Sequence, residues 1–317
     1  MKKIKLMLAF AACGLISQQA ISAASWELTS GSNTSPVYGN GRTFTPATGS
    51  DPSSVNLTVT AFSATGATSN ATSSNTGRNA NDTIETAYLS IYTPSAGLGV
   101  VNRDGSNTAS VAVNSSTGTD ANEYVNNGSE HAMDNNGRSD VMLLTFTEQI
   151  ALQSLKLGWS SGDSDVFILA WSGAAAPVGG ITSQLNGKTF SQIAADTASD
   201  PANGWRLIDS LSNVGVNTTN FNTSAPVYSS YWLIGTGGFN SAATGGGVTS
   251  GDKNSSNNWI AFGSTGASYD YVKLAAVGGS KFTPPPPPPG IPEPGSLALA
   301  GAAFLGMVGL RRRKAAA

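Results

Sequence analysis

Short runs of alternating hydrophobic and polar residues, separated by turn-forming residues, predict that most of the chain is β-structure. The alternation is regular in residues 55–59 and 155–159, as in strands with one buried face. The expected strands span residues 55–62, 84–92, 110–113, 141–147, 155–159, 166–171, 205–208, 231–234, 259–262 and 269–277. Only residues 180–198 favour a helix, centred on residues 192–196. Short strands with this spacing predict an all-β fold, with an antiparallel β-sandwich or jelly-roll-like body.

The N-terminal hydrophobic segment has a different pattern. Three lysines within residues 1–5 precede an apolar run at residues 6–16, and small residues follow at 22–24. This order predicts a secretory signal peptide that is cut after Ala24. The only cysteine, Cys13, lies inside the segment, so the mature protein has no thiol chemistry. A lipoprotein leader around Cys13 is the alternative.

A second hydrophobic segment lies near the C-terminus. Residues 297–310 are apolar and rich in glycine and alanine, and a helix of that length spans about 21 Å. This predicts a short transmembrane helix, somewhat shorter than the roughly 30 Å hydrocarbon core. The flanking sequence motifs are the triplet Pro292, Glu293 and Pro294 before it, and the basic residues Arg311, Arg312, Arg313 and Lys314 after it. The positive charges predict that this end stays in the cytoplasm.

The order of triplet, hydrophobic span and basic tail closely resembles the PEP-CTERM sorting signal of Gram-negative bacteria. The resemblance implies export through the Sec translocon and transient anchoring in the inner membrane. It also implies processing near Pro292–Pro294 by an exosortase, and delivery to the cell surface or the extracellular exopolysaccharide matrix. An ordinary tail anchor that is never cut is the alternative for the same segment.

A second resemblance covers the centre of the chain, over residues 130–277. The segments 131–146, 155–171, 231–235 and 269–274 place Asp, Asn and Trp residues between expected strands. This arrangement is similar to that of the exosortase-dependent surface protein family. The resemblance supports a surface protein and implies no particular chemical activity.

These patterns divide the chain into four parts. A signal peptide (1–24) precedes a secreted body (25–283), a polyproline linker (284–290) and the sorting signal (291–317). The whole chain has 17 Lys+Arg and 19 Asp+Glu residues. The leader holds three of the basic residues, and the tail holds four basic residues and one acidic residue, which leaves a body with 10 basic and 18 acidic side chains. A net charge of about −8 argues against a nucleic-acid partner and suits divalent cations.

Two Asp-rich turns precede expected strands and form the candidate metal site. Carboxylate and amide oxygens are the ligands that Ca²⁺ prefers. If the two following strands run parallel, both turns lie at the same end of the body. The candidate calcium ligands are Asp134, Asn136, Asp140, Asp163 and Asp165. The alternative is an Asx-rich turn that caps its own backbone. No other cofactor is expected.

The candidate catalytic motifs are weak. Residues 158–162 fit the G-x-S-x-G pattern around Ser160, but the nucleophile elbow of α/β-hydrolases needs a histidine base that follows the serine, and the only histidine, His131, precedes it. We therefore expect no enzyme activity. The sequence predicts a non-catalytic exported protein with a structural or adhesive role. The alternatives are an extracellular carbohydrate-binding module, in which exposed tryptophans stack on sugar, and a secreted hydrolase.

Overall fold

The structure is a computed structural model of the full chain. It describes residues 24–29, 40–47, 54–66, 83–91, 94–101, 132–136, 138–173, 176–200, 202–260, 262, 265–282, 299 and 302–303. Contacts divide the chain into two units, Met1–Phe282 and Thr283–Ala317. In the second unit, the described residues Leu299, Ala302 and Ala303 are helical. Within the part of the chain that is described, no helix is both long and apolar enough to cross a membrane.

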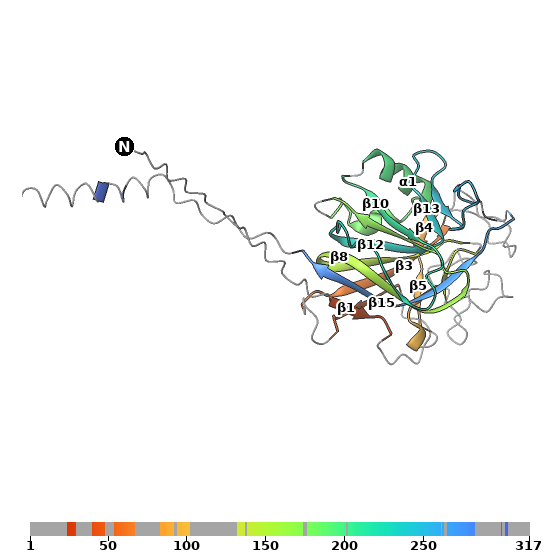
Figure 1. The fold of residues 1–317 in the computed structure, drawn as a ribbon, viewed down its shortest axis with the longest axis horizontal. Helices are drawn as coiled ribbons and strands as arrows, with labels where there is room; N and C mark the ends of the chain where they lie inside the picture. The colour runs from red at the N-terminus through yellow and green to blue at the C-terminus, as the bar shows by residue number, and fades with distance from the viewer. Residues whose placement is uncertain are drawn as a thin grey trace, which may run out of the picture. The chain divides into compact units, whose positions relative to one another are not determined.

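The described part of the first unit consists mainly of strands (Figure 1). In chain order the elements are β1 (Ala24–Glu27), β2 (Gly41–Phe44), β3 (Leu57–Gly66), β4 (Thr83–Thr86), β5 (Tyr88–Ser90), η1 (Pro94–Ala96), β6 (Gly99–Val101), β7 (Met133–Asp134), β8 (Asp140–Gly162), β9 (Val166–Trp171), η2 (Ile181–Gln184), α1 (Phe190–Ser199), β10 (Trp205–Leu211), β11 (Thr218–Asn220), β12 (Ser229–Thr236), β13 (Gly238–Asn240), β14 (Gly247–Thr249) and β15 (Asp270–Lys281). The prediction of a mostly β, antiparallel fold is confirmed, because every pair of neighbouring strands is antiparallel.

The main sheet has the order β1-β15-β8-β12-β9-β10, and β8 is its central element. The first part of β8 pairs with β3 and β12, and the part from Ile150 onward pairs with β15 and β11. The burial pattern changes at the same place. Residues 140–144 are all buried, whereas buried Leu155 and Leu157 alternate with exposed or half-buried neighbours. The first part of β8 is therefore covered on both faces, and the later part on one.

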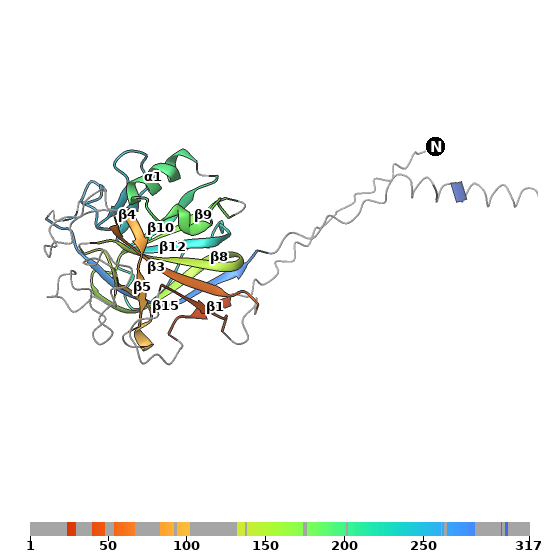
Figure 2. The ribbon, with the colours of Figure 1, turned by 180° about the vertical axis from the view of Figure 1, so that it is seen from behind.

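Two hydrophobic cores lie on opposite faces of the strands around β12. On β9, Ile168 and Ala170 belong to the first core and Phe167 and Leu169 to the second, because successive side chains of a strand point to opposite faces. All six residues of β9 are buried. The first core is the larger and includes Trp26 from β1. The second is completed by residues of α1 and η2. Figures 1 and 2 show α1 at the top of the body and β1 with β15, which belong to the main sheet, at the bottom.

The helix α1 forms where the sequence favours one. Thr189 is its N-cap, and the Thr189 side chain accepts a hydrogen bond from the Gln192 N–H at 3.1 Å. The Gln192 side chain accepts one in return from the Thr189 N–H at 2.8 Å. This reciprocal capping box satisfies two donors that the first helical turn leaves open. The helix then buries Phe190 and Ile193 in the second core.

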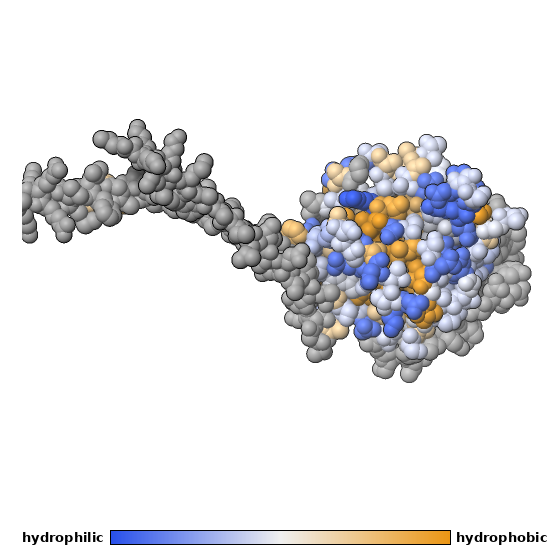
Figure 3. Space-filling model, in the orientation of Figure 1, coloured by the Kyte–Doolittle hydropathy of each residue, from blue (hydrophilic) through white to orange (hydrophobic). Residues whose placement is uncertain are grey.

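Some of the expected strands differ from those in the structure. The strand expected at residues 110–113 lies outside the described residues. In the range 259–262, the residues that the structure describes form no strand, and an isolated bridge joins Trp259 to Lys253. The strands expected at 141–147 and 155–159 are parts of the single strand β8. The polar residues 147–149 interrupt the hydrophobic pattern because β8 changes neighbours there. On the surface, hydrophobic residues gather in a central band on one face (Figure 3).

Candidate functional site

The two Asp-rich turns lie at the same end of the sheet. Strands β8 and β9 both pair antiparallel with β12, on either side of it, so they run parallel to each other. Gly235 of β12 is opposite Val141 on one side and Phe167 on the other. A Cβ at Gly235 would lie 2.3 Å from a Phe167 ring carbon, so only glycine fits between the two strands. The sequence placed both turns at one end of the body on the condition that the two following strands run parallel, and β8 and β9 do so.

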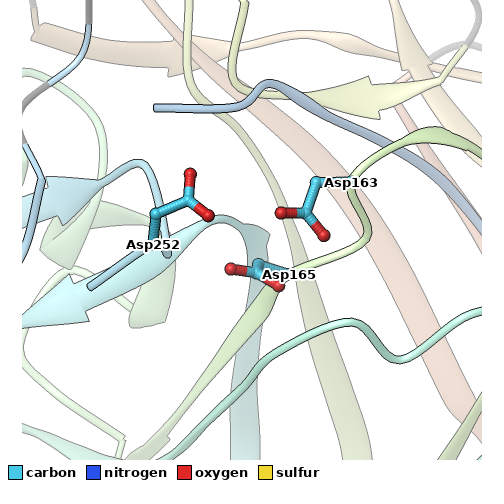
Figure 4. Close-up of side chains that lie close together, drawn as sticks. All are labelled: Asp163, Asp165 and Asp252. Atoms are coloured by element: carbon cyan, nitrogen blue, oxygen red, sulfur yellow. The ribbon is translucent and has the colours of Figure 1, made fainter. Parts of the chain in front are cut away.

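Three carboxylates meet at this end, and we call them the carboxylate cluster. Asp163, Asp165 and Asp252 each offer an oxygen that lies within 4.8 Å of those of the other two. Figure 4 shows the three side chains converging from different segments. Asp163 and Asp165 lie between β8 and β9, and Asp252 follows β14. Asp165 is buried, and the other two are half-buried, which leaves the cluster open on one side.

Backbone amides hold each carboxylate of the cluster in place. The Asn213 N–H donates to Asp165 Oδ1 at 2.6 Å. The Ser164 N–H donates to Asp163 Oδ1 at 2.8 Å. Asp252 Oδ2 accepts from the Ser268 N–H at 2.7 Å. Each of these bonds uses one oxygen of its carboxylate.

A fourth carboxylate, Asp270, ties the cluster to the other turn. Asp270 Oδ1 accepts a hydrogen bond from the Asp165 N–H at 2.7 Å, and Asp270 Oδ2 accepts one from the Asn135 side-chain amide. The Asp270 N–H donates back to Asn135 Oδ1 at 2.9 Å. Asp270 is fully buried at the start of β15. The first turn and the cluster are thus joined through one buried side chain.

Burial changes the acidity of two of these groups. Desolvation, together with the nearby carboxylates of Asp163 and Asp252, raises the pKa of Asp165 to about 7, against the hydrogen bond from Asn213. Desolvation likewise raises the pKa of Asp270 to about 8, against the hydrogen bonds from Asp165 and Asn135. Crowded, desolvated carboxylates keep a proton or bind a cation to relieve their repulsion.

The other predicted ligands form a separate group in the first turn. The Asn136 N–H donates to Asp134 Oδ1 at 2.8 Å, and the Asp134 N–H lies 3.4 Å from Asp140 Oδ2. The Asn136 side chain donates to the Tyr271 hydroxyl at 2.6 Å. Of the five predicted ligands, the structure places Asp163 and Asp165 together in the cluster, and Asp134, Asn136 and Asp140 in a self-bonded turn beside it.

Sequence reasoning missed Asp252 and Asp270. Asp270 had a usable signal, because Asp140, Asp165 and Asp270 each stand at the start of a buried strand or directly before one. Asp252 follows Gly251 in a polar segment with no such pattern. A Cβ at Gly251 would lie 2.2 Å from Asp165 Oδ2, and Gly251 has a φ of +91°. The close approach of that backbone, which only the fold reveals, brings Asp252 to the cluster.

The residues weighed for catalysis and sugar binding lie elsewhere. Ser160 is within β8, opposite Val272, and not at a strand-to-helix turn, while His131 lies outside the described residues. Among the tryptophans, Trp159 and Trp259 are half-buried. The Lys273 ammonium lies 5.3 Å from the Trp159 ring centroid, and that of Lys253 lies 4.3 Å from the Trp259 ring. Burial lowers the pKa of Lys273 to about 8.

Comparison with known protein families identifies the C-terminal motif. Residues 290–314 match the model of the PEP-CTERM protein-sorting motif. The chain carries a PEP-CTERM sorting signal. The matched residues include the Pro292–Pro294 triplet and the basic cluster at 311–314. PEP-CTERM signals direct exosortase-dependent export to the surface of Gram-negative bacteria. No curated protein and no solved structure matches the chain.

Proposed function

We propose that the protein is a non-catalytic component of the cell surface or the exopolysaccharide matrix, with a structural or adhesive role. The observation that carries the proposal is the PEP-CTERM motif at residues 290–314. The acidic, cysteine-free body agrees with a secreted protein, and the leader pattern at residues 1–24 supplies an entry to the Sec translocon. The hydrophobic span at 297–310 would then hold the protein in the inner membrane as a short helix until an exosortase cuts near Pro292–Pro294.

An epitope tag placed after Ala317 tests this proposal. In a host that has the exosortase, the tag should be lost from the mature protein, and in a host without the enzyme it should stay attached. The N-terminus of the mature protein should lie near Ser25 by mass spectrometry. A full-length, tagged protein that persists at the surface of the competent host would sink the proposal.

The absence of catalysis is part of the proposal and has its own test. Ser160 lies inside a paired strand, where a strained nucleophile elbow cannot form. A fluorophosphonate probe should therefore leave the protein unlabelled. Labelling that disappears in Ser160→Ala would instead support the secreted hydrolase.

We also propose that the body is a β-sandwich that binds calcium at the carboxylate cluster. The sandwich is supported by the way β8 passes from one group of strands to another. The calcium site is supported by the approach of Asp163, Asp165 and Asp252 to within 4.8 Å. Calcium takes six to eight oxygens, so backbone carbonyls and water would complete the shell.

Thermal melting with calcium or with chelator distinguishes this site from a purely structural network. A ligand that binds only the folded state at a hundredfold excess over Kd adds about 2.7 kcal/mol to the free energy of unfolding, which raises Tm by several degrees. Millimolar calcium should raise the Tm of the wild type but not that of Asp163→Asn/Asp252→Asn. The matched control, Asp134→Asn/Asp140→Asn, should keep the calcium response. Equal melting of the wild type in both buffers contradicts a calcium site.

A further inference from the structure

Within the described residues, β15 is the last strand of the body, and the chain leaves the body directly from its end. The residue after β15 is Phe282, and its N–H donates to the Gln149 carbonyl at 3.0 Å. The first unit also ends at Phe282, and the sorting motif follows at residues 290–314. A pull on the C-terminal segment therefore enters the body at the end of β15.

The strand β15 is paired along both of its edges. All of its 12 residues except Ala275 have register partners on β8. Three segments pair with the opposite edge, namely β7, an isolated bridge from Leu98, and β1. Residues 270–280 are all buried. The strand can therefore leave the sheet only by breaking pairs on both sides.

Side chains reinforce the end of β15 from which the chain leaves. The Phe282 ring meets that of Tyr228 edge-on, with 5.2 Å between centroids. The Lys281 ammonium forms an ion pair with the Glu148 carboxylate. These two partners lie on β8 and just before β12, so side chains as well as backbone join this end of β15 to its neighbours.

The carboxylate cluster lies at the opposite end of β15. Asp270 begins the strand, and its Oδ1 accepts a hydrogen bond from the Asp165 N–H of the cluster at 2.7 Å. At the other end, Lys281 is opposite Ile150 of β8. A strand of 12 residues is about 40 Å long at ~3.3 Å per residue. This single strand thus connects the point where the chain leaves the body to the cluster end.

The direction of a pull decides how strongly such a strand resists it. The hydrogen bonds between antiparallel strands are perpendicular to the strands. A pull along β15, with the cluster end held, therefore strains all of its pairs with β8 at the same time. A pull that separates the two strands at Lys281 strains one pair after another. The pairs must break together in the first case and break singly in the second.

We propose that β15 is the load-bearing strand of the protein, so that the body withstands force applied between its C-terminal attachment and the cluster end. An adhesive contact at the cluster end loads β15 along its length, which is the direction in which its pairs with β8 act together. This inference rests on the sorting proposed above and takes the C-terminal end as the point of attachment.

Single-molecule stretching in two directions tests the inference. The full chain with Cys13→Ala, which removes the only native cysteine, is made in a host without exosortase and carries one handle after Ala317. The second handle is attached to an engineered cysteine, Val216→Cys or Gln149→Cys. Both positions are exposed, so neither change should lower the Tm.

The two cysteine handles hold the body at opposite ends of β15. Val216 follows Gly215, whose N–H donates to the Ser164 hydroxyl beside the cluster at 2.9 Å. A handle at Val216 therefore loads β15 along its length. The Gln149 carbonyl accepts the Phe282 N–H at the other end. A handle at Gln149 therefore pulls β15 and β8 apart from that end.

At the same pulling speed, the rupture force should be at least twofold higher with the Val216 handle than with the Gln149 handle. Forced unfolding follows the unfolding rate in the pulled direction, so the two variants should differ in force at the same Tm. Equal forces, or a higher force with the Gln149 handle, overturn the inference and leave the sorting proposal standing. Retention of the full-length tagged protein at the surface of a host with exosortase overturns the sorting proposal, and the inference with it.

Discussion

Individual carboxylates determine the acidity and the packing at the carboxylate cluster. Asp270 is fully buried and accepts two hydrogen bonds, from Asp165 and Asn135. Asp165 is buried beside Asp163 and Asp252, which repel its charge. These groups differ from ordinary surface aspartates because the fold, rather than the solvent, provides their partners. Their raised pKa values and close packing give two measurable consequences.

The first consequence is a pH-dependent stability in the presence of chelator. Asp165 has an ordinary pKa of 3.8 and a folded-state pKa of about 7, so between these values the folded state holds a proton that the unfolded state has released. The free energy of unfolding therefore falls as the pH rises from about 4 to 7, by an amount on the order of 2–4 kcal/mol. Asp165→Asn should flatten this slope, measured by urea denaturation at several pH values.

Two other groups shape the same profile. Asp270, with a folded-state pKa of about 8, keeps a residual slope of the same sign in Asp165→Asn. Lys273, whose pKa is lowered to about 8, acts oppositely and only above that pH. The control is Asp209→Asn, a partly exposed residue whose Oδ1 also accepts one backbone hydrogen bond. A slope in Asp165→Asn identical to that of the wild type would show that Asp165 is ionised normally.

The second consequence concerns Gly251. Both Gly251 and Gly245 have positive φ values, +91° and +69°, so alanine is strained at either position. Only at Gly251 would the new Cβ also meet Asp165 Oδ2, at 2.2 Å. Gly251→Ala should therefore lose about 1–3 kcal/mol more than Gly245→Ala, measured by chemical denaturation. Equal losses in the two variants would show that the loop moves freely away from Asp165.

At the level of the strands, β8 and β1 each connect separate parts of the body. The 23 residues of β8 connect the two groups of strands, so its polar residues 147–149 mark a change of neighbours and not a turn. The four residues of β1 supply a fully buried tryptophan and cover β15. Exposed strand edges pair with other chains, so we expect the short β1 to limit self-association through the edge of β15.

Removal of β1 tests this protective role. A body that starts at residue 30 should self-associate through the open edge of β15, and should lose the packing of Trp26, a change worth about 3–5 kcal/mol. Light scattering at increasing protein concentration measures the first effect. A synthetic peptide of residues 24–29 should restore the monomer, whereas a scrambled peptide should not. A truncated body that stays monomeric at all concentrations would contradict the role of β1.

The whole chain consists of one compact unit and a second unit that contains the sorting motif. The two cores of the first unit share the strands β8, β9 and β12. Because a shared strand cannot leave one core and stay in the other, both cores should be lost together. The two units therefore differ in content: the first contains the folded body, and the second contains the sorting signal.

Cooperative unfolding of the body follows from the shared strands. Residues 25–283 should unfold in one transition, with the same midpoint by far-UV circular dichroism and by tryptophan fluorescence. Fluorescence reports on both cores, since Trp26 and Trp232 lie in one and Trp171 and Trp205 in the other. Two separate transitions would divide the body into two domains.

The sequence alone determined the features that depend on local order. The PEP-CTERM motif is a continuous segment read by composition and spacing, so residues 290–314 could be assigned without a structure. Strand β9 and helix α1 were also predictable, since a short apolar run and a preference for helix are local properties. Those signals act over a few residues and need no distant partner.

Only the tertiary structure decided which carboxylates meet and how the strands pair. Asp252 is 87 residues from Asp165 in the chain, and it reaches the cluster because the Gly251 backbone passes close to Asp165. The pairing of β1 with β15 likewise joins the two ends of the body. Such contacts depend on the closure of long loops, whose free-energy cost is repaid only by packing formed elsewhere in the fold. For that physical reason, no local pattern in the sequence encodes them.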